Sequence, residues 1–485
     1  MPKWRINIGL GLYVALEQRG DAHNRSNSPH GVLRTDNPKL PATISVLPAA
    51  STLPSPVTEE EHTQMAKEPA VTAVPVADQE GQTVQNNFAQ SVTPWDVKGA
   101  EVDGVKQDID YDKLFKKFGT RRIDEEMLER FTKVTGHAPH LFLRRGIFFS
   151  HRDLGVILDR HEQGKPFYLY TGRGPSRGHM HIGHMLPFLF CKWLQDVFDV
   201  PLVVQLTDDE KFLYKPELKA EQTYEYALAT VREIAAIGFK PEKTFIFSDM
   251  GHMGGAFYLN VLKISRCITF SMARSSFGYT DSDHIGKIHF PCIQAAPAFC
   301  STFPSIFGNR TDIPCLIPCG IDQDPYFRLT RDVAKPLKYK KPSLIHSQFL
   351  PALQGGTTKM SSSVDNSAIF MDDSPNKIKS KINGNAFSGG PTSLEELRKF
   401  GSNPDVDISY RYMTYFVEDD QELADLAVSY RKGEITSGEM KARCIKVLQD
   451  FIGSFQERER SITDDDVKNF MDPDYPRHFA CLAKK

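Results

Sequence analysis

The 485-residue chain has no long apolar run and few cysteines. No stretch of about 18 or more apolar residues occurs, so we expect no membrane-spanning helix. There are 8 cysteines, and Cys315 and Cys319 form a CxxxC pair, but no CxxC pair or Cys/His array has the spacing of a zinc site. We therefore expect reduced thiols, as in an intracellular protein, and no metal ion held by protein side chains.

A large excess of charge of either sign is also absent. The chain has 59 lysines and arginines against 61 aspartates and glutamates, which gives a formal net charge of -2. A nucleic-acid partner would therefore have to meet a local basic surface rather than an overall positive field. The hydrophobic content of 40% is ordinary, and the length suits about two or three domains, so we expect a globular core.

The N-terminal segment lacks the patterns of a folded domain. Prolines recur from Pro38 to Pro75 among many Ser, Thr, Ala and Gln residues, so residues 1–105 are predicted to form a disordered extension. The basic start followed by INIGLGLYVAL is similar to the apolar part of a signal peptide, but no small-residue cleavage site follows it. Acidic residues are sparse up to Pro56, as in a weak organellar transit peptide. We expect a cytoplasmic protein, with a mitochondrial location as the alternative.

Residues 106–371 are predicted to form an α/β domain. Asp124 caps a predicted amphipathic helix that Gly136 ends. Short apolar runs at residues 166–171, 201–206 and 244–249 predict buried strands, with helical patterns between them. This alternation predicts a Rossmann-like parallel sheet with helices on both faces.

Two details of this domain bear on a ligand site. Residues 315–327 predict a further strand whose carboxyl end carries polar residues, which is where open α/β sheets bind ligands. Pro187 lies near the start of the helix after the first strand, and we expect it within the first turn, which tolerates proline.

Residues 372–485 show helical patterns and little strand pattern. Helix starts of the capping-box type occur at Ser393, Thr436 and Thr463. A separate helical domain is therefore predicted to close the chain.

Three histidines, His179, His181 and His184, lie within the stretch GHMHIGHM. They are poorly placed as metal ligands, because His181 and His184 share a helix face that His179 does not, and no HExxH pattern is present. Phosphate binding fits the surroundings better: a strand leads into a glycine loop, and HIGH opens a helix whose amides and dipole favour an anion. Gly183 permits a base or ribose to approach the backbone, and the imidazoles can donate hydrogen bonds to phosphate. A purely structural role near the helix start is the alternative.

The stretch KMSSS, residues 359–363, lies in the predicted polar loop QGGTTKMSSSVDNS, with Gly355 and Gly356 as hinges. A solvated serine-rich loop is the simpler interpretation. A lysine followed by hydroxyl groups also suits a mobile clamp on a phosphate chain. Two phosphate-suited elements in one chain favour nucleotide binding.

Together these two motifs resemble the paired HIGH and KMSKS motifs of the class I aminoacyl-tRNA synthetases. The flanking sequence is more specific and resembles the tryptophanyl-tRNA synthetases of the eukaryotic and archaeal type, from about residue 108 to the C-terminus. The segments that carry the resemblance are YLYTGRGPS (168–176), KWLQDVFDVPLVVQLTDDEKF (192–212), FPCIQAAPAF (290–299), GIDQDPYFRLTRDVA (320–334) and FSGGPTSLEELRKFG (387–401). One departure is Arg177, Gly178 and His179, which stand where the family usually has a serine or a small acidic stretch.

The resemblance implies an activity and partners. L-Tryptophan would be activated by ATP, which brings Mg²⁺ with it, and then transferred to the 3′-terminal ribose of tRNA(Trp). Residues 372–485 would form the anticodon-binding domain, and the catalytic domains would pair in a homodimer. No association with a membrane is expected.

The resemblance, together with the chemistry of phosphate binding, implies a set of candidate site residues. His181, His184 and Lys359 are the candidate catalytic residues. The candidate ATP-binding residues are Gly172, Arg173, His181, Gly183, His184, Lys359, Ser361 and Ser362. The candidate tryptophan-binding residues are Tyr170, Gln205, Glu210, Gln294 and Gln323.

Other interpretations stay open. A tyrosyl-tRNA synthetase shares fold and chemistry, although its pocket would place a carboxylate near the phenol hydroxyl. A catalytically inactive RNA-binding paralogue and a small nucleotidyltransferase with a HIGH motif are further alternatives. The basic stretches at residues 335–341 and 377–381 are predicted to be solvated surface rather than RNA contacts.

Overall fold

A computed structural model of the chain describes residues 89–103, 105–361 and 365–483. Most of the predicted extension lies outside these ranges. Within them, no helix combines the length and the apolar character needed to span a bilayer.

The expectation of a disordered extension up to residue 105 differs from the structure at its C-terminal end. Strands β1 (Ser91–Val92) and β2 (Val97–Lys98) form an antiparallel hairpin, and β2 continues onto β13 (Gly355–Lys359), which pairs with β12 (Pro351–Ala352). A second hairpin consists of β3 (Glu101–Val102) and β4 (Val105–Lys106). Composition did not reveal this structure because it depends on tertiary contacts: Val92 and Val97 are buried in a small core with Leu114.

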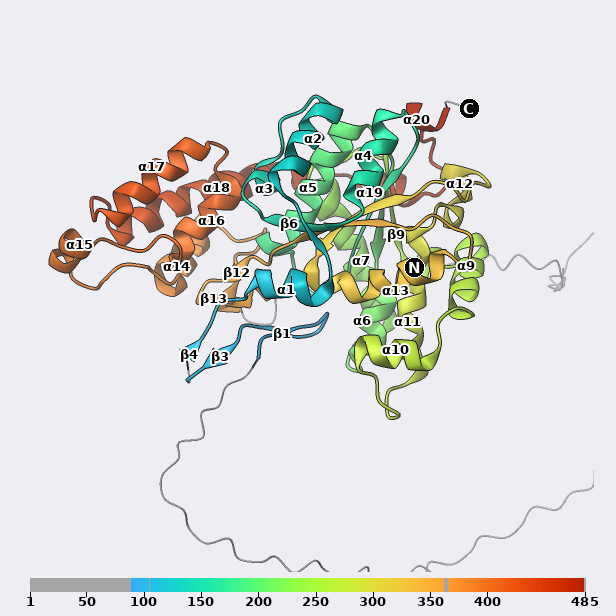
Figure 1. Cartoon of the computed structure of the whole chain (residues 1–485), viewed down its shortest axis with the longest axis horizontal. Coiled ribbons are helices and arrows are strands. Elements are labelled where there is room, and N and C mark those ends of the chain that lie inside the picture. The colour runs from blue at the N-terminus through green and yellow to red at the C-terminus, as the bar shows by residue number, and fades with distance from the viewer. Residues whose placement is uncertain (1–88, 104, 362–364, 484–485) are drawn as a thin grey trace, which may run out of the picture. The chain divides into compact units, whose positions relative to one another are not determined.

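A seven-stranded sheet forms the centre of the fold (Figure 1). Its strands, in spatial order, are β5 (Arg121–Arg122), β6 (Phe148–Arg152), β11 (Ser343–Ser347), β10 (Cys315–Gly320), β7 (Tyr168–Arg173), β8 (Leu202–Leu206) and β9 (Thr244–Ser248). The five strands from β11 to β9 are mutually parallel, as predicted, whereas β6 pairs antiparallel with both β11 and β5. The Rossmann-like α/β prediction is confirmed, with antiparallel strands added at one edge.

The order of the strands locates a ligand-binding crevice. From β7 the chain proceeds through β8 to β9 on one side, and then crosses over to β10 on the other side of β7. The carboxyl ends of β7 and β10 therefore flank a topological switch point, where connections leave in opposite directions and open a crevice.

The sheet separates two apolar cores because successive side chains of a strand point to opposite faces. On β7, Leu169 belongs to one core, while Tyr168 and Tyr170 belong to the other. The core that contains Leu169 continues into the C-terminal helices, where Tyr412 and Leu448 are fully buried.

Helices cover both faces of the sheet and fill its connections. They are α1 (Tyr111–Phe118), α2 (Glu125–Thr135), α3 (Leu141–Arg144), α4 (Leu154–Glu162), α5 (Ile182–Phe198), α6 (Asp208–Tyr214), α7 (Ala220–Ala235), α8 (Asp249–His252), α9 (Gly255–Ser265), α10 (Phe270–Phe277), α11 (Ile285–Ala295), α12 (Pro304–Phe307) and α13 (Asp324–Ala334). The predicted caps of α2 are confirmed: Asp124 accepts a hydrogen bond from the Met127 amide, and Gly136 ends the helix with φ 72°.

Pro187 lies deeper in α5 than expected. The helix begins at Ile182, so Pro187 stands beyond the first turn. Because proline has no amide hydrogen, it cannot donate to the Gly183 carbonyl four residues earlier. The interruption falls next to the ligand-binding crevice, where Pro187 lines the pocket.

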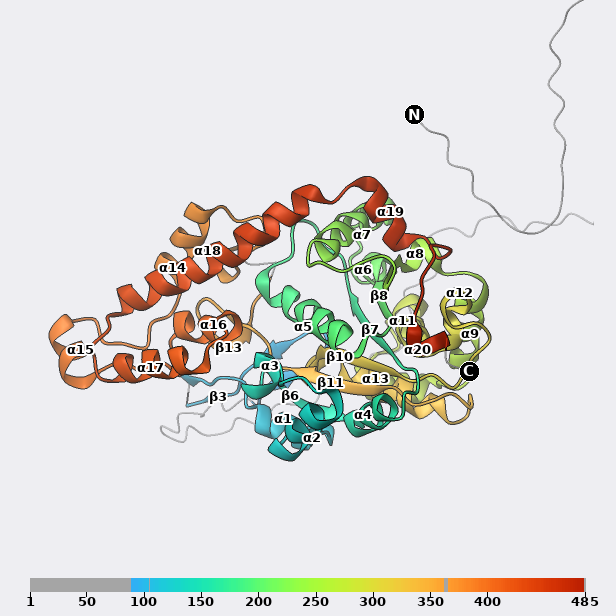
Figure 2. The ribbon, with the colours of Figure 1, turned by 90° about the horizontal axis from the view of Figure 1, so that it is seen from above.

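The C-terminal part is helical, as predicted. It contains α14 (Pro375–Asn385), α15 (Leu394–Phe400), α16 (Ile408–Phe416), α17 (Asp420–Arg431), α18 (Ser437–Ser461), α19 (Asp464–Met471) and α20 (Ala480–Ala483). Ser393 caps α15, and Thr436 and Thr463 form capping boxes with Glu439 and Asp466. Helices α14 to α17 gather on one side of the sheet, and α18, 25 residues long, runs from this group to α19 beside β9 (Figures 1 and 2).

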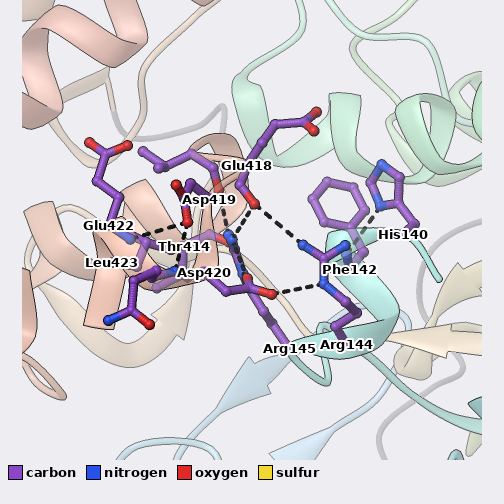
Figure 3. A network of polar contacts seen from close by, with 12 residues as sticks. His140, Phe142, Arg144, Arg145, Thr414, Glu418, Asp419, Asp420, Glu422 and Leu423 are labelled. Atoms are coloured by element: carbon purple, nitrogen blue, oxygen red, sulfur yellow. Dashed lines mark hydrogen bonds and ion pairs between the residues drawn. The ribbon is translucent and has the colours of Figure 1, made fainter. Parts of the chain in front are cut away.

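Two arginines of the α3 region attach these helices to the sheet domain. Arg145 donates from Nη1 to the carbonyl oxygens of Thr414 and Val417, both at 2.7 Å, and it pairs with Asp420 (Figure 3). Arg144 pairs with the other oxygen of Asp420. These cations lie where α16 ends and α17 begins, so they satisfy carbonyls left unpaired by the end of a helix.

Candidate functional site

A pocket of about 310 Å³ opens at the switch point of the sheet. Its walls come from the ends of β7 and β10, the start of α5, the segment after β8, and Lys359 at the end of β13. Of the predicted site residues, those that line it are Tyr170, Gly172, Arg173, Gly183, His184, Gln205, Glu210, Gln294, Gln323 and Lys359. Residues that lie as much as 189 positions apart in the sequence therefore meet in one cavity.

The two histidines of HIGH form one stacked pair. His181 is the N-cap residue of α5, and its ring lies 3.5 Å from that of His184, centroid to centroid, with an interplanar angle of 19°. His181 is 3% exposed and does not line the pocket directly, but it backs the ring of His184, which does. Both nitrogens of His181 and Nδ1 of His184 are buried without a hydrogen-bond partner. Buried polar atoms of this kind need a partner, which a ligand can supply.

Both imidazoles are neutral near pH 7. Burial lowers the pKa of His181 to about 3, assisted by the charges of Arg173 and Lys359. Burial also lowers the pKa of His184 well below its usual value. Each ring thus carries one N–H donor and one acceptor.

Gly183 lies between the two histidines, and a side chain at this position would be in tight contact with its neighbours. A Cβ atom at this position would stand 3.1 Å from Cε1 and Nδ1 of His181 and 3.4 Å from Cβ of Leu350. The tight contact is with the His181 ring, so the glycine allows the two imidazoles to stack.

Arg173 is a buried cation rather than a surface residue. It lies on β7, together with Gly172, so the predicted glycine loop begins two residues later than expected. Arg173 is 9% exposed, and its Nε is buried without a partner. Burial lowers the pKa of Arg173 to about 10, which leaves the guanidinium charged at neutral pH. A buried, charged and incompletely bonded guanidinium suits an anionic ligand.

Lys359 stands at the end of strand β13, whereas the sequence predicted a loop at this position. The difference arises because Thr358 pairs with Lys98 of β2, a contact with a distant hairpin. Lys359 Nζ lies 2.9 Å from Oδ2 of Asp322 and 5.3 Å from the ring centroid of Phe349. Ser361 is partly buried and follows the strand, whereas Ser362 lies outside the described residues.

The predicted tryptophan-binding residues form a polar network beside apolar side chains of the pocket, among them Phe188, Ile317 and Phe327. The Tyr170 hydroxyl lies 2.6 Å from Oε1 of Gln205 and 2.9 Å from the carbonyl oxygen of Gln294. Nε2 of Gln205 donates to both carboxylate oxygens of Asp249, each at 2.9 Å, which fixes the orientation of the amide. Oε1 of Gln205 therefore faces Tyr170, and an acceptor lone pair is available for a ligand N–H.

Glu210 and two glutamines, Gln294 and Gln323, line the same pocket. Oε2 of Glu210 accepts a hydrogen bond of 2.9 Å from the Thr207 hydroxyl, and Nε2 of Gln294 donates to Oε1 of Gln323 at 3.2 Å. These side chains present acceptor oxygens, which suit an ammonium group.

Several pocket residues were not predicted from the sequence. Pro94 comes from the segment expected to be disordered, and Thr207, Lys211 and Asp322 also line the cavity. Asp322 lies in the segment GIDQD, at the polar carboxyl end of a predicted strand. This position could have identified Asp322 as a pocket residue. No local signal marks Pro94, because its position depends on the hairpin that packs against β13.

Buried carboxylates lie behind Gln205. Asp208 and Asp249 are fully buried, and Asp209 is 9% exposed. Burial and the neighbouring Asp209 carboxylate raise the pKa of Asp249. These groups lie behind the pocket and are not among its lining residues.

Two residues outside the pocket, Lys381 and His179, have contacts that the sequence did not predict. In the basic stretch 377–381, Lys381 is buried and pairs with Asp373 at 2.9 Å, so this part is an internal ion pair and not solvated surface. His179 is exposed, is not among the residues that line the pocket, and contacts Glu233 on α7.

Comparison with known proteins agrees with this geometry. The family model of the tRNA synthetases class I (W and Y) matches residues 162–453. A curated "Tryptophan--tRNA ligase, cytoplasmic" from Schizosaccharomyces pombe is 59% identical over 383 residues, which cover 79% of this chain and 97% of the relative. The protein of the same description from Homo sapiens is 55% identical over 384 residues, covering 79% and 80%.

Solved structures give the same result. A parasite tRNA synthetase in a product-bound crystal structure has a TM-score of 0.74 at 47% identity, over 78% of this chain and 99% of that one. A tryptophanyl-tRNA synthetase from Encephalitozoon cuniculi bound to tryptophan has a TM-score of 0.70 at 44% identity, over 76% and 99%. The chain therefore belongs to the class I tRNA synthetases for tryptophan and tyrosine, and within them to the tryptophan–tRNA ligases.

Proposed function

We propose that this protein attaches L-tryptophan to tRNA(Trp) in an ATP-dependent reaction, through a tryptophanyl adenylate. The observation that carries the proposal is the single pocket in which Arg173, His184 and Lys359 face the Tyr170–Gln205 pair. One end of the cavity offers cations and the neutral imidazole of His184, and the other offers hydrogen-bonding groups beside apolar side chains.

The first step needs no protein nucleophile. A carboxylate oxygen of tryptophan attacks the α-phosphorus of ATP, a P–O bond forms, and the bond to pyrophosphate breaks. The protein accelerates the step by aligning the two substrates and by stabilising the charge on the phosphates and on the leaving pyrophosphate.

The phosphate side of the pocket supplies these contacts. At the start of α5, the neutral ring of His184 lines the pocket and can donate one N–H, and the ring of His181 stacked behind it carries a second N–H without a partner. Arg173 supplies a charged fork. Lys359, followed by Ser361 and Ser362, acts on the pyrophosphate side. For Lys359 to reach a phosphate, it exchanges its ion pair with Asp322 for the ligand. Mg²⁺ accompanies ATP and is held mainly by the phosphates.

The other end of the pocket selects the amino acid. Tyr170 and Gln205 provide an acceptor for the indole N–H, and Glu210, Gln294 and Gln323 surround the α-ammonium group. A ligand that leaves the buried Gln205–Tyr170 pair without a donor loses binding energy, so smaller side chains are rejected without an editing domain.

In the second step, a hydroxyl of the 3′-terminal ribose of tRNA attacks the carbonyl carbon of the adenylate, and AMP leaves. We assign residues 106–371 to the catalytic domain and residues 372–485 to the anticodon-binding domain. The change of architecture supports this division, because the described residues from 375 onward form helices α14 to α20, whereas the strands of the central sheet all end at or before Ser347.

We infer that the protein works as a homodimer. Helix α9 carries Tyr258, Leu259 and Leu262 on one face, and these side chains are 48%, 51% and 43% exposed. Phe270 of α10 is 43% exposed. Several large apolar side chains exposed together on a catalytic domain are typical of an interface, and Leu259→Glu should convert a dimer to a monomer in sedimentation velocity.

We place the protein in the cytoplasm, in line with the description of the relatives from Schizosaccharomyces pombe and Homo sapiens. Tagging at the C-terminus, which leaves the N-terminus intact, tests this location. A mitochondrial signal would contradict it.

ATP/pyrophosphate exchange with single amino acids tests the activity. We expect exchange with tryptophan and not with tyrosine, followed by charging of tRNA(Trp). Exchange with tyrosine alone would assign the tyrosine branch, and no exchange with any amino acid would indicate an inactive RNA-binding paralogue.

A further inference from the structure

The segment that enters α5 contacts the long C-terminal helix α18. His179 lies two residues before His181, the N-cap residue of α5, and its ring faces Glu233 of α7 and Glu459 of α18. Nδ1 of His179 is 3.0 Å from Oε1 of Glu233 and 4.0 Å from Oε1 of Glu459. One side chain therefore lies between the sheet domain and the C-terminal helices, directly beside the HIGH segment.

Glu233 holds the backbone as well as the imidazole. Its Oε1 accepts a hydrogen bond of 2.9 Å from the amide of Met180, the residue between His179 and His181. The Glu233 side chain is almost fully buried. A displaced Glu233 would therefore release both His179 and the backbone that places His181.

A second set of contacts joins the same two elements. The Met180 carbonyl accepts from the Met371 amide at 2.8 Å, and the Ile182 amide donates to Ile369. Gln456, on α18 near Glu459, donates from Nε2 to the Met371 carbonyl at 2.8 Å. Helix α18 thus reaches the HIGH segment by two routes, one through His179 and one through Met371.

The carboxylates around His179 favour a positive charge at this position. Glu233 faces it from α7, Glu459 from α18 and Asp372 from the segment before α14. Of the arginines, Arg232 interacts with Glu459 and Arg173 interacts with Glu233. The hydrogen bond to Glu233 raises the pKa of His179 to about 9, so the ring is an imidazolium at neutral pH.

We propose that His179 is a positioning residue for ATP: as an imidazolium shared by Glu233 and Glu459, it ties the segment before α5 to α18 and holds His181 and His184 in place. The inference rests on the proposed function for its readout. The proposal means that α18 influences the ATP site, because Glu459 of α18 belongs to the ion bridge with His179 and Glu233.

The sign of the pH dependence follows from the raised pKa. The folded-state pKa of about 9 keeps the bridge formed at neutral pH, and the bridge is lost as the pH rises through about 9; the stability that it contributes is fully present below pH 6.5, the ordinary pKa of histidine. Loss of the proton removes the cation between the Glu233 and Glu459 carboxylates, and their mutual repulsion favours separation of α18 from the segment before α5.

Steady-state ATP/pyrophosphate exchange between pH 7 and 10 tests the proposal. For His179→Ala we expect an approximately tenfold higher KM for ATP at pH 7, with KM for tryptophan unchanged, because the phosphate groups are misplaced and the indole pocket is not. The wild-type KM for ATP should rise near pH 9, and this rise should be absent from the variant.

Two further variants separate positioning from a merely structural role. Glu459→Gln keeps the hydrogen bond to Glu233 but removes a negative charge, so the rise in KM for ATP should shift to lower pH. His179→Lys keeps a cation and should restore the wild-type KM at pH 7. As a matched control, His161→Ala removes a histidine whose ring packs 5.0 Å from that of Phe198, and it should leave the pH profile unchanged.

The titration of His179 itself is measured by NMR of the imidazole, with His179→Ala for assignment. A pKa below 7 would overturn the proposal, as would an unchanged KM for ATP in His179→Ala over the whole pH range.

His179, Glu233 and Glu459 lie close enough to hold a metal ion, with ligand atoms within 4.8 Å of one another. One equivalent of bound zinc in the purified protein that is lost in His179→Ala would replace the ion bridge by a metal site. Wild-type protein without tryptophan-dependent exchange would refute the proposed function, whereas the NMR titration would still decide the bridge.

Discussion

The hydroxyl of Tyr170 lies 2.6 Å from Oε1 of Gln205, and this contact joins neighbouring strands β7 and β8 at the floor of the pocket. Asp249 fixes the other end of the Gln205 amide. The acceptor intended for an indole N–H is therefore oriented before any ligand arrives, which lowers the cost of binding.

Removal of this hydroxyl should weaken tryptophan binding. We expect Tyr170→Phe to raise KM for tryptophan about tenfold, roughly 1.4 kcal/mol, because Gln205 loses a buried partner. KM for ATP should not change. The matched control is Tyr168→Phe, two residues earlier on the same strand, whose hydroxyl bonds to the Pro297 carbonyl away from the pocket. Equal effects of the two substitutions on KM for tryptophan would contradict the assignment.

Lys359 should act mainly on the chemical step. We expect Lys359→Ala to lower kcat of ATP/pyrophosphate exchange about 100-fold, since charge on the departing pyrophosphate loses a cation. Tryptophan affinity, measured by calorimetry without ATP, should be retained. Lys335→Ala, which removes an exposed lysine outside the pocket, is the control. A fall in kcat as large for Lys335→Ala would show that only general charge matters.

Gly183 should be intolerant of a methyl group. Because its Cβ would stand 3.1 Å from the His181 ring, Gly183→Ala should push that ring from its stack on His184 and raise KM for ATP about tenfold. Gly384→Ala, in α14, meets nothing within 4 Å and should leave the kinetics unchanged. Wild-type KM for ATP in Gly183→Ala would show that the close packing is not required.

The buried His181 should make stability depend on pH. Its folded-state pKa of about 3 lies below the unfolded value of 6.5, so its contribution is present above pH 6.5 and is lost as the pH falls. The loss approaches about 1.4 kcal/mol per pH unit below that value. We expect His181→Asn to lose less free energy of unfolding than the wild type between pH 7 and pH 5, measured by urea denaturation. Identical losses would indicate that the ring is not buried in its neutral form.

Arg145 should stabilise the attachment of the C-terminal helices more than Arg144 does. Its side chain is 13% exposed and donates to two backbone carbonyls at 2.7 Å, whereas the Arg144 side chain is 36% exposed (Figure 3). Arg145→Ala should lower the free energy of unfolding by about 2 kcal/mol, because it leaves two partly buried carbonyls unpaired, and Arg144→Ala by less. Urea denaturation of both variants measures the difference. A larger effect for Arg144→Ala would contradict this ranking.

Local patterns were enough to predict many elements. The cap at Asp124, the stop at Gly136 and the helix starts at Thr436 and Thr463 depend on side chains and backbone a few residues apart. The buried strands β7, β8 and β9 were found within one or two residues, because apolar runs of that length between helical patterns identify parallel strands.

Patterns failed where a distant segment determined the structure. Lys359 ends a strand rather than lying in a loop because β13 pairs with a hairpin more than 250 residues earlier in the chain, within a segment whose composition indicated disorder. Lys381 is buried because Asp373 neutralises it, although its basic neighbours predicted solvated surface. His179 showed no metal or catalytic pattern, and its role depends on carboxylates from α7 and α18.

The sequence alone therefore determined the kinds of element, the helix ends and the chemical groups that suit a nucleotide and an aromatic amino acid, because these depend on short-range hydrogen bonding and on the periodicity of apolar residues. Only the tertiary structure decided that His181 and His184 stack as neutral rings, that Arg173 is buried, and which carboxylates surround His179. Burial and electrostatic interaction act through space, and the distances on which they depend exist only once the chain has folded.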